Sequence, residues 1–300
     1  MAADLDIVLA RPGAYERSAL VAKYGRRACD GALADARMVR VARGIFAGTL
    51  HAESLWTRAH ALVLACGAEA AISGHAALFL HGCVLSTPTS ALVVTTSPTR
   101  VRRRVPQVHL LRTMHAFPAL PLHGIPTAAP EVALLHAMGE MSRERARALA
   151  LEALASQRID VGTVAQTVGE RRFRGRRALR EALAAFDVGV RSVLEYDGLT
   201  QVLPGPEFAH LIRQHAITVE GRRMLLDTYD PALKVAFEFD GVAFHTSRER
   251  WESDRERDTL LASVGIQTVR FTSRDVRERA GWCRVMALAV LAQRRGLVTP

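Results

Sequence analysis

Residues 234–241 read Lys-Val-Ala-Phe-Glu-Phe-Asp-Gly, an apolar run that contains two acids. A run of this length and composition predicts a strand. Glu238 and Asp240 are two positions apart, so their side chains would point to the same face of a sheet. Because a buried carboxylate is costly unless its charge is compensated, this strand combines a fold signal with a chemical one.

The residues on either side predict the rest of a small domain. Asp230-Pro231 predicts a turn before this strand, and Pro204-Gly205-Pro206 interrupts the first helix. The resulting order, α-β-β-β-α-β-α, indicates a mixed α/β domain. The expected elements are a helix at 191–202, strands at 211–218, 223–227 and 234–241, a helix at 248–263, a strand at 267–271 and a helix at 273–293.

Three carboxylates are expected to converge at one edge of this sheet. Asp227 would end its strand, and the short loop that follows would place it near Glu238 and Asp240. Three acids together need a cation, and the hard, oxygen-liganded Mg²⁺ (or Mn²⁺) fits best. Such an ion could activate water for phosphodiester cleavage, with His245 as a general acid or base and Glu195 as a further carboxylate. The alternative is structural: Asp227 caps a turn, and the other acids pair with arginines.

A larger set of residues agrees in order and spacing with a known family. It comprises Glu195, Asp227, Glu238 to Gly241, His245, Asp254 with Arg257, Leu260, Gly265 and Val269 to Thr272. The set resembles the small nuclease domain related to very-short-patch-repair (Vsr) endonucleases, a PD-(D/E)XK-superfamily domain with a restriction-endonuclease-like fold. The resemblance implies that Asp227 and Glu238 bind the metal and that Asp240 and His245 line the site. It also places Arg257 and Arg270 near the active face. The superfamily has lysine where this chain has Asp240.

Charge divides the chain into two parts. The 300 residues carry a net charge of +10. Residues 1–190 hold 24 basic and 15 acidic residues, whereas residues 191–300 hold 16 and 15. The first part therefore indicates a polyanionic partner such as DNA, and the second is nearly neutral but rich in carboxylates.

The basic residues of the N-terminal part follow a pattern of their own. Helices are expected at 14–22 and 29–36, and residues 38–48 alternate apolar and basic around a glycine, which predicts a hairpin. Two helices followed by a basic hairpin describe a winged helix-turn-helix, in which Arg40 and Arg43 would reach DNA phosphates. An ordinary small subdomain with exposed arginines is equally compatible with this pattern.

Two further arginine clusters lie between residues 51 and 187. Arg102, Arg103 and Arg104 fall in a basic loop, and an expected helix at 170–185 carries six arginines, Arg172 and Arg176 among them. Each cluster is either a solvated face or a phosphate-binding surface.

Short motifs in the first part resemble a second family. The segments are Arg40 to Gly48, Ser73 to Ala77 with His81-Gly82, and Gly124 to Thr127. They are similar to AbiEi-type antitoxins of type IV toxin–antitoxin systems. That resemblance implies an N-terminal winged helix that binds promoter DNA, an antitoxin domain and a cognate toxin as partner.

The whole chain is therefore expected to be α/β (α+β overall) with three units. These are a winged-helix-like unit at 1–50, a mixed α/β antitoxin-like domain at 51–187 and a nuclease-like domain at 188–300. Four scattered cysteines without a C-x-x-C pair, and no signal peptide or membrane span, indicate a cytoplasmic protein. The expected function is metal-dependent DNA cleavage. The alternatives are an antitoxin-like autorepressor with an inactive nuclease fold and a structural module without a DNA role.

Overall fold

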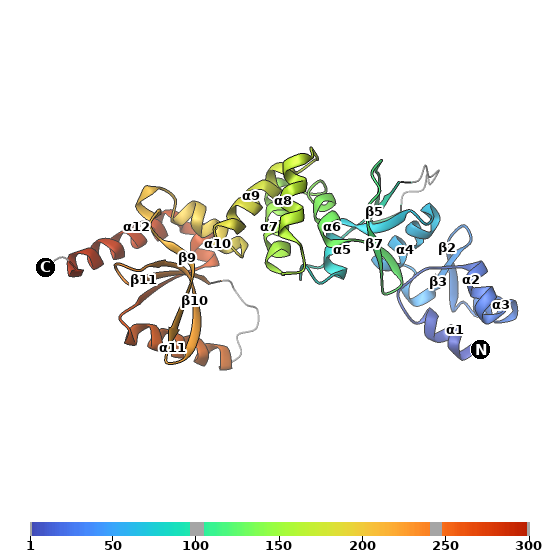
Figure 1. Cartoon of the computed structure of the whole chain (residues 1–300). Helices are drawn as coiled ribbons and strands as arrows, with labels where there is room; N and C mark the ends of the chain where they lie inside the picture. The colour runs from blue at the N-terminus through green and yellow to red at the C-terminus, as the bar shows by residue number, and fades with distance from the viewer. Residues whose placement is uncertain (1, 97–104, 241–247, 299–300) are drawn as a thin grey trace. The chain divides into compact units, whose positions relative to one another are not determined.

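The computed structural model of the chain describes residues 2–96, 105–240 and 248–298 (Figure 1). Helices and strands alternate along the chain, which confirms the predicted α/β class. Contacts divide the chain into two compact units, Met1–Arg180 and Glu181–Pro300. The boundary between them falls inside helix α9 (Arg176–Asp187), just before the predicted boundary at 187.

The first 50 residues of the first unit form short helices and a small sheet. The predicted hairpin is confirmed, and it turns at Arg43-Gly44, where Gly44 has φ of +74°. A left-handed glycine is what a two-residue hairpin turn requires. The two predicted helices are also present, but the first begins only at Arg17, because Tyr15–Glu16 pair with β3, and the second begins at Arg26. The sheet has the order β1-β3-β2. The elements are α1 (Ala2–Leu9), β1 (Tyr15–Glu16), α2 (Arg17–Tyr24), α3 (Arg26–Ala34), β2 (Met38–Ala42) and β3 (Ile45–Gly48).

A five-stranded mixed sheet forms the centre of the rest of this unit, with the order β6-β5-β4-β8-β7. Strand β5 is buried along its whole length, as its apolar sequence predicts. Helices α4, α5 and α6 contact this sheet. The elements are η1 (Thr49–His51), α4 (Leu55–Cys66), β4 (Ala70–Ser73), α5 (Gly74–Leu80), β5 (Ala91–Thr95), β6 (Val108–Arg112), β7 (Ala119–Leu122), β8 (Ile125–Ala128), α6 (Pro130–Ala137), α7 (Arg143–Ala155) and α8 (Val161–Glu170).

The expected single helix at 170–185 is wrong. Helix α8 ends at Glu170 and α9 begins at Arg176, so the arginine cluster spans a break. Gly175 has φ of +84°, and a Cβ there would lie 2.1 Å from the carbonyl oxygen of Met138. Only glycine fits such a close approach, and the chain turns at this point because of it. The helical pattern on both sides of the break hid it in the sequence.

The second unit has the predicted order α-β-β-β-α-β-α. Its sheet has the strand order β12-β11-β10-β9, in which β11 and β12 are parallel and the other neighbours are antiparallel. The strand predicted to end at Asp227 continues to Asp230. The elements are α10 (Val193–Asp197), η2 (Gly198–Val202), η3 (Pro206–Phe208), β9 (Ile212–Val219), β10 (Arg222–Asp230), β11 (Val235–Asp240), α11 (Arg248–Ser263), β12 (Gln267–Thr272) and α12 (Ser273–Val298).

Both faces of β11 are covered, which explains its apolar sequence. On one face, Phe237 packs in a core with Phe271 and with residues of α12. On the other face, Ala236 packs with Leu261 of α11 and with Ile266. Figure 1 shows α11 and α12 on opposite sides of the sheet. Burial of one such phenylalanine stabilises the fold by about 1.5–3 kcal/mol. Strand alternation places Glu238 and Asp240 on the face of Ala236, toward α11.

The structure also describes the state of the cysteines and the character of the helices. All four cysteines are buried and free. Within the described ranges, no helix combines the length and the apolar character needed to cross a membrane.

Candidate active site

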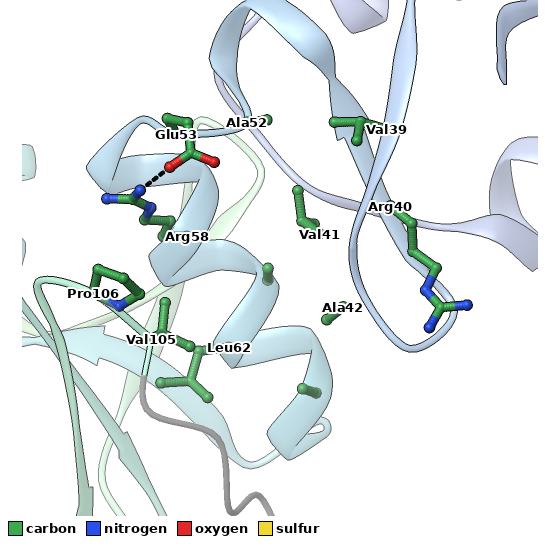
Figure 2. Close-up of a pocket in the computed structure, with 12 residues that line it drawn as sticks. Val39, Arg40, Val41, Ala42, Ala52, Glu53, Arg58, Leu62, Val105 and Pro106 are labelled. Carbon is green, nitrogen blue, oxygen red and sulfur yellow. Dashed lines mark hydrogen bonds and ion pairs between the residues drawn. The ribbon is translucent and has the colours of Figure 1, made fainter. Parts of the chain in front are cut away.

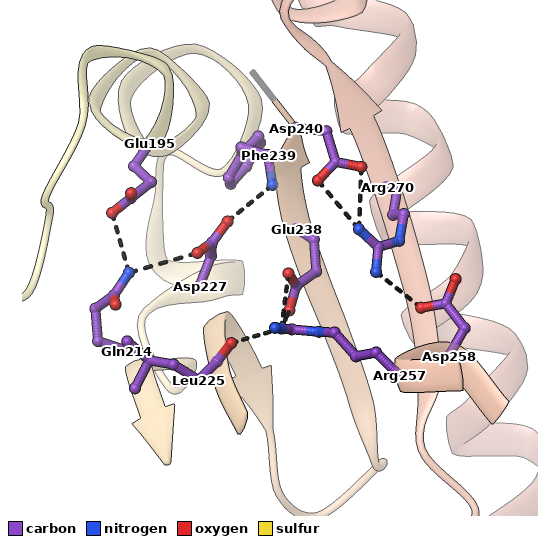
Figure 3. Close-up of polar contacts among 10 residues, drawn as sticks. All are labelled: Glu195, Gln214, Leu225, Asp227, Glu238, Phe239, Asp240, Arg257, Asp258 and Arg270. Carbon is purple, nitrogen blue, oxygen red and sulfur yellow. Dashed lines mark hydrogen bonds and ion pairs between the residues drawn. The ribbon is translucent and has the colours of Figure 1, made fainter. Parts of the chain in front are cut away.

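Asp227 and Glu238 lie on neighbouring strands at the same height of the sheet (Figure 3). Thr228 of β10 is opposite Phe237 of β11, and the two acids occupy the next positions along these antiparallel strands. The predicted proximity of Asp227 and Glu238 is therefore confirmed. The reason differs from the prediction, because Asp227 lies within its strand and the strand register brings it to Glu238.

Two donors hold the half-buried carboxylate of Asp227. Its Oδ2 accepts a hydrogen bond from the backbone N–H of Phe239 at 3.0 Å, and its Oδ1 accepts one from the side-chain amide of Gln214 at 3.5 Å. Burial raises the pKa of Asp227, and the Phe239 N–H and the Arg257 charge oppose that rise. The carboxylate is thus oriented by the fold and costly to keep charged.

Glu238 is the most buried acid of the site, with a side chain 7% exposed. Nη2 of Arg257, from α11, donates to both carboxylate oxygens at 2.9 and 3.0 Å and to the carbonyl oxygen of Leu225 at 2.5 Å. Burial raises the pKa of Glu238 to about 7, with Arg257 opposing the rise and Asp227 adding to it. The buried Nε of Arg257 has no hydrogen-bond partner in the described part of the chain.

Asp240 belongs to a second and more exposed ion-pair group. Nη1 of Arg270, on β12, donates to both oxygens of Asp240 at 3.1 Å, and Nη2 donates to Asp258 of α11 at 2.8 Å. The carboxylate side chains are 44% and 47% exposed. Burial lowers the pKa of Arg270, but the two carboxylates together raise it above its ordinary value. Arg270 is thereby held in place between two acids.

Glu195 joins the site through Gln214. The side-chain amide of Gln214 donates to Oε2 of Glu195 at 3.0 Å as well as to Asp227. The backbone N–H of Arg191 also donates to Oε2 of Glu195, at 2.8 Å. Burial raises the pKa of Glu195, and the Asp227 charge adds to this effect. The site therefore contains three half-buried or buried carboxylates from three different elements.

The donor set of Asp227 and Glu238 fits a hard divalent cation. Both side chains offer carboxylate oxygens, and a cation between them would offset the electrostatic repulsion between the two negative charges. Among the residues that the structure describes, no group of three His, Cys, Asp or Glu side chains is arranged to hold a metal. Mg²⁺ commonly binds through one or two carboxylates and keeps several waters, so a pair is sufficient. Arg257 contacts both oxygens of Glu238, and it must release one for a cation to bind there.

The structure also places the arginines predicted to bind DNA. Arg40 and Arg43 are exposed on the hairpin, and Arg172 is exposed in the connection after α8. Arg176 is engaged differently, because its Nε and Nη2 donate to the carbonyl oxygens of Val168 and Gly169. It therefore closes the C-terminal end of α8. His245 and the loop arginines Arg102, Arg103 and Arg104 lie outside the described residues.

A cavity of about 360 Å³ lies between the hairpin strand β2 and α4 (Figure 2). Its walls are mainly apolar, and Arg58 pairs with Glu53 at one end. Figure 2 shows the Arg40 side chain directed away from this pair. Arg40 is therefore presented at the rim and exposed, where an external phosphate could reach it.

Two participants in the site, Gln214 and Asp258, were not among the predicted site residues. A signal for Gln214 does exist in the sequence, because Glu220-Gly221 forms a tight turn and Val219 pairs with Arg222. Counting back from that turn brings Gln214 opposite Asp227. Asp258 has no comparable signal, since helix-face acids beside arginines are common on solvated helices.

No protein-family model matches this chain, and no curated protein matches it either. The two family resemblances therefore rest on the residues that carry them in the sequence.

Proposed function

We propose that the Glu181–Pro300 unit hydrolyses DNA phosphodiesters with Mg²⁺ or Mn²⁺ held by Asp227 and Glu238. One observation carries the proposal: two carboxylates meet on neighbouring strands, and burial raises the pKa of both. Perturbed acids of this kind gather at functional sites, although ion-pair networks also produce them. The exposed arginines of the Met1–Arg180 unit would bind the DNA backbone, and the free buried cysteines suit a reducing cytoplasm.

The protein's own residues would divide the work as follows. The bound ion would supply Lewis acidity and lower the pKa of a coordinated water. Asp227 and Glu238 would hold it, and Arg257 would release Glu238 and remain in the site as a cation. Its unpartnered Nε–H would then be satisfied by a phosphate oxygen. Arg257 thus supplies the positive charge that the superfamily lysine would provide, and His245 remains a predicted acid or base.

Cleavage of supercoiled plasmid tests this proposal. We expect Asp227→Asn and Glu238→Gln to lose activity by more than about 100-fold, because residues that merely support metal ligands already cost about 10- to 100-fold. Glu278→Gln is the matched control, since this acid is 61% exposed and pairs only with Arg274 in the described structure. Undiminished cleavage by both site variants would falsify the assignment.

A second function is favoured by a different observation. Arg257 contacts both oxygens of Glu238, and Asp240 stands at the lysine position and contacts Arg270. An ion-pair network of this kind is compatible with an inactive nuclease fold that serves as a binding module. The protein would then be an AbiEi-type antitoxin and transcriptional autorepressor with a cognate toxin as partner.

Binding to the protein's own upstream DNA separates these two functions. An autorepressor would bind that DNA without cutting it in Mg²⁺ or Mn²⁺, and its affinity would fall steeply with salt. A nuclease would convert the same fragment to shorter products. Co-purification with the product of a neighbouring gene would test the toxin partner.

A further inference from the structure

Gln214 has an unusual backbone conformation for a residue within a strand. Its φ is +47°, in the left-handed region that residues other than glycine rarely adopt. His215 pairs with Leu226 and Arg213 pairs with Thr228, so the ladder of β9 and β10 is interrupted only at Gln214 and Asp227. Such outliers are found where the surrounding structure imposes them, often at functional sites.

In this conformation the Gln214 side chain contacts two carboxylates. Its amide nitrogen lies 3.0 Å from Oε2 of Glu195 and 3.5 Å from Oδ1 of Asp227. Both neighbours are acceptors, and only the NH₂ end of the amide carries two donors. The orientation of the amide is therefore determined by its partners. No other described side chain donates to both of these acids.

Each of the two acids also accepts from a second donor, at the other oxygen of Asp227 and at the same oxygen, Oε2, of Glu195. Asp227 accepts from the Phe239 N–H at 3.0 Å, and Glu195 accepts from the Arg191 N–H at 2.8 Å. Each of these contacts fixes one acid alone. Gln214 is the element that joins them, and it sets their separation without adding charge to the site.

We propose that Gln214 is a positioning residue that, by bridging Asp227 to Glu195, holds Asp227 in the orientation in which it would bind the divalent cation together with Glu238. This inference rests on the proposed nuclease function and adds a residue to its machinery. Gln214 contacts neither cation nor phosphate in this role; it acts through the two carboxylates. A carboxylate kept in place by a neutral donor binds a metal without first having to reorganise.

The test compares Gln214→Gly with Glu220→Gly in the full-length protein. Glu220 also has a left-handed backbone, with φ of +49°, but it lies in the turn after β9. Glycine relieves the backbone at both positions, whereas only Gln214→Gly removes the amide. We expect both variants to keep the melting temperature of the unaltered protein. We expect Gln214→Gly alone to bind Mn²⁺ about ten-fold more weakly, measured by electron paramagnetic resonance of free Mn²⁺.

Gln214→Asn is the second variant. Asparagine tolerates the left-handed conformation and keeps the amide, but its side chain is one methylene too short to bridge both acids. We expect it to fold normally, to bind Mn²⁺ more weakly and to need more Mn²⁺ for half-maximal cleavage. A purely structural role for Gln214 would instead lower the melting temperature and leave the Mn²⁺ affinity unchanged.

The outcomes separate the two proposals. If the unaltered protein binds Mn²⁺ and cleaves DNA while both Gln214 variants match it, the positioning role alone is overturned. If Glu220→Gly loses as much Mn²⁺ affinity as Gln214→Gly, the effect comes from the backbone and the role is again overturned. If the unaltered protein neither binds Mn²⁺ nor cleaves DNA, the proposed nuclease function fails, and the positioning role fails with it.

Discussion

Two sets of arginines, one in each unit of this protein, lie in opposite environments. In the first unit, Arg40, Arg43 and Arg172 are exposed to solvent. In the second, Arg257 and Arg270 lie partly buried against carboxylates of the sheet. The unit boundary sharpens the contrast in charge: residues 1–180 hold 24 basic and 13 acidic residues, whereas residues 181–300 hold 16 and 17.

Arginine content alone therefore does not identify a nucleic-acid surface. An exposed guanidinium is available to an external phosphate, whereas one bound to a buried carboxylate compensates a charge that the fold has already desolvated. The first set therefore presents positive charge outward, whereas the second set, Arg257 and Arg270, uses it internally.

The substitution with the greatest predicted loss of stability, Phe237→Ala, tests whether the core around β11 stabilises the second unit alone. Phe237→Ala should destabilise that unit by about 3–5 kcal/mol, because it opens a cavity in a fully buried core. Hydrogen exchange should show lost protection in β9 to β12 and unchanged protection in β4 and β5. Leu225→Ala, on an exposed side chain of the same sheet, is the control and should change stability by less than about 0.5 kcal/mol. Equal loss of protection in both units would show that this core supports more than the second unit.

A second substitution tests whether Arg257 compensates the charge of buried Glu238. Arg257→Met should cost about 2–3 kcal/mol in urea unfolding at pH 8. This is less than for a fully buried pair, because Glu238, with a pKa of about 7, can take up a proton. The difference in the free energy of unfolding between the unaltered protein and Arg257→Met should become smaller below pH 7, where Glu238 is protonated in both proteins. Arg274→Met is the control, and its exposed pair with Glu278 should contribute less than about 0.5 kcal/mol. A loss of the same size in both variants would contradict the internal role.

A pH titration tests a buried titratable group of the first unit, His60. His60 is buried, its Nδ1 accepts from the backbone N–H of Ala14 at 3.2 Å, and burial lowers its pKa to about 4. The folded pKa lies below the unfolded value near 6.5, so the stabilisation is present above pH 6.5 and lost as the pH falls toward 4. The stabilisation that His60 contributes to the first unit should fall by about 2 kcal/mol between pH 7 and pH 5, measured by urea unfolding as the difference between the unaltered protein and His60→Gln. Glu140, whose pKa burial raises to about 7, gives the opposite pH dependence in both proteins and therefore cancels in this difference. A difference that does not change with pH would show that His60 does not carry this dependence.

The smallest expected effect concerns the exposed arginines. Arg40→Ala and Arg43→Ala should each change folding stability by less than about 0.5 kcal/mol. Each should reduce the slope of log affinity for DNA against log salt by about 1, if it neutralises one phosphate. Arg274→Ala, in the second unit, is the control and should leave the slope unchanged. Slopes that are identical in all three variants would remove these two arginines from the DNA surface.

Local sequence determined the elements and their order. The apolar run at 235–239, the helix at 248–263 and the hairpin at 38–48 are each recognisable because apolar spacing and turn residues act over a few neighbouring positions. The same signals placed Asp227 near Glu238. They missed the break at Gly175, because its cause is the carbonyl oxygen of Met138, far away in the sequence.

The contacts of the acids form only in the folded chain, even though counting from the Glu220-Gly221 turn indicates that Gln214 lies opposite Asp227. Arg257 reaches Glu238 from 19 positions away, and Gln214 reaches Asp227 from 13 positions away. These contacts depend on strand register and on how α11 packs against the sheet. By itself the sequence therefore determined which strands carry the acids, whereas folding determined which of them are buried, paired or bridged. The physical reason is that hydrophobic periodicity is local, but compensation of a buried charge depends on groups that only the folded chain brings together.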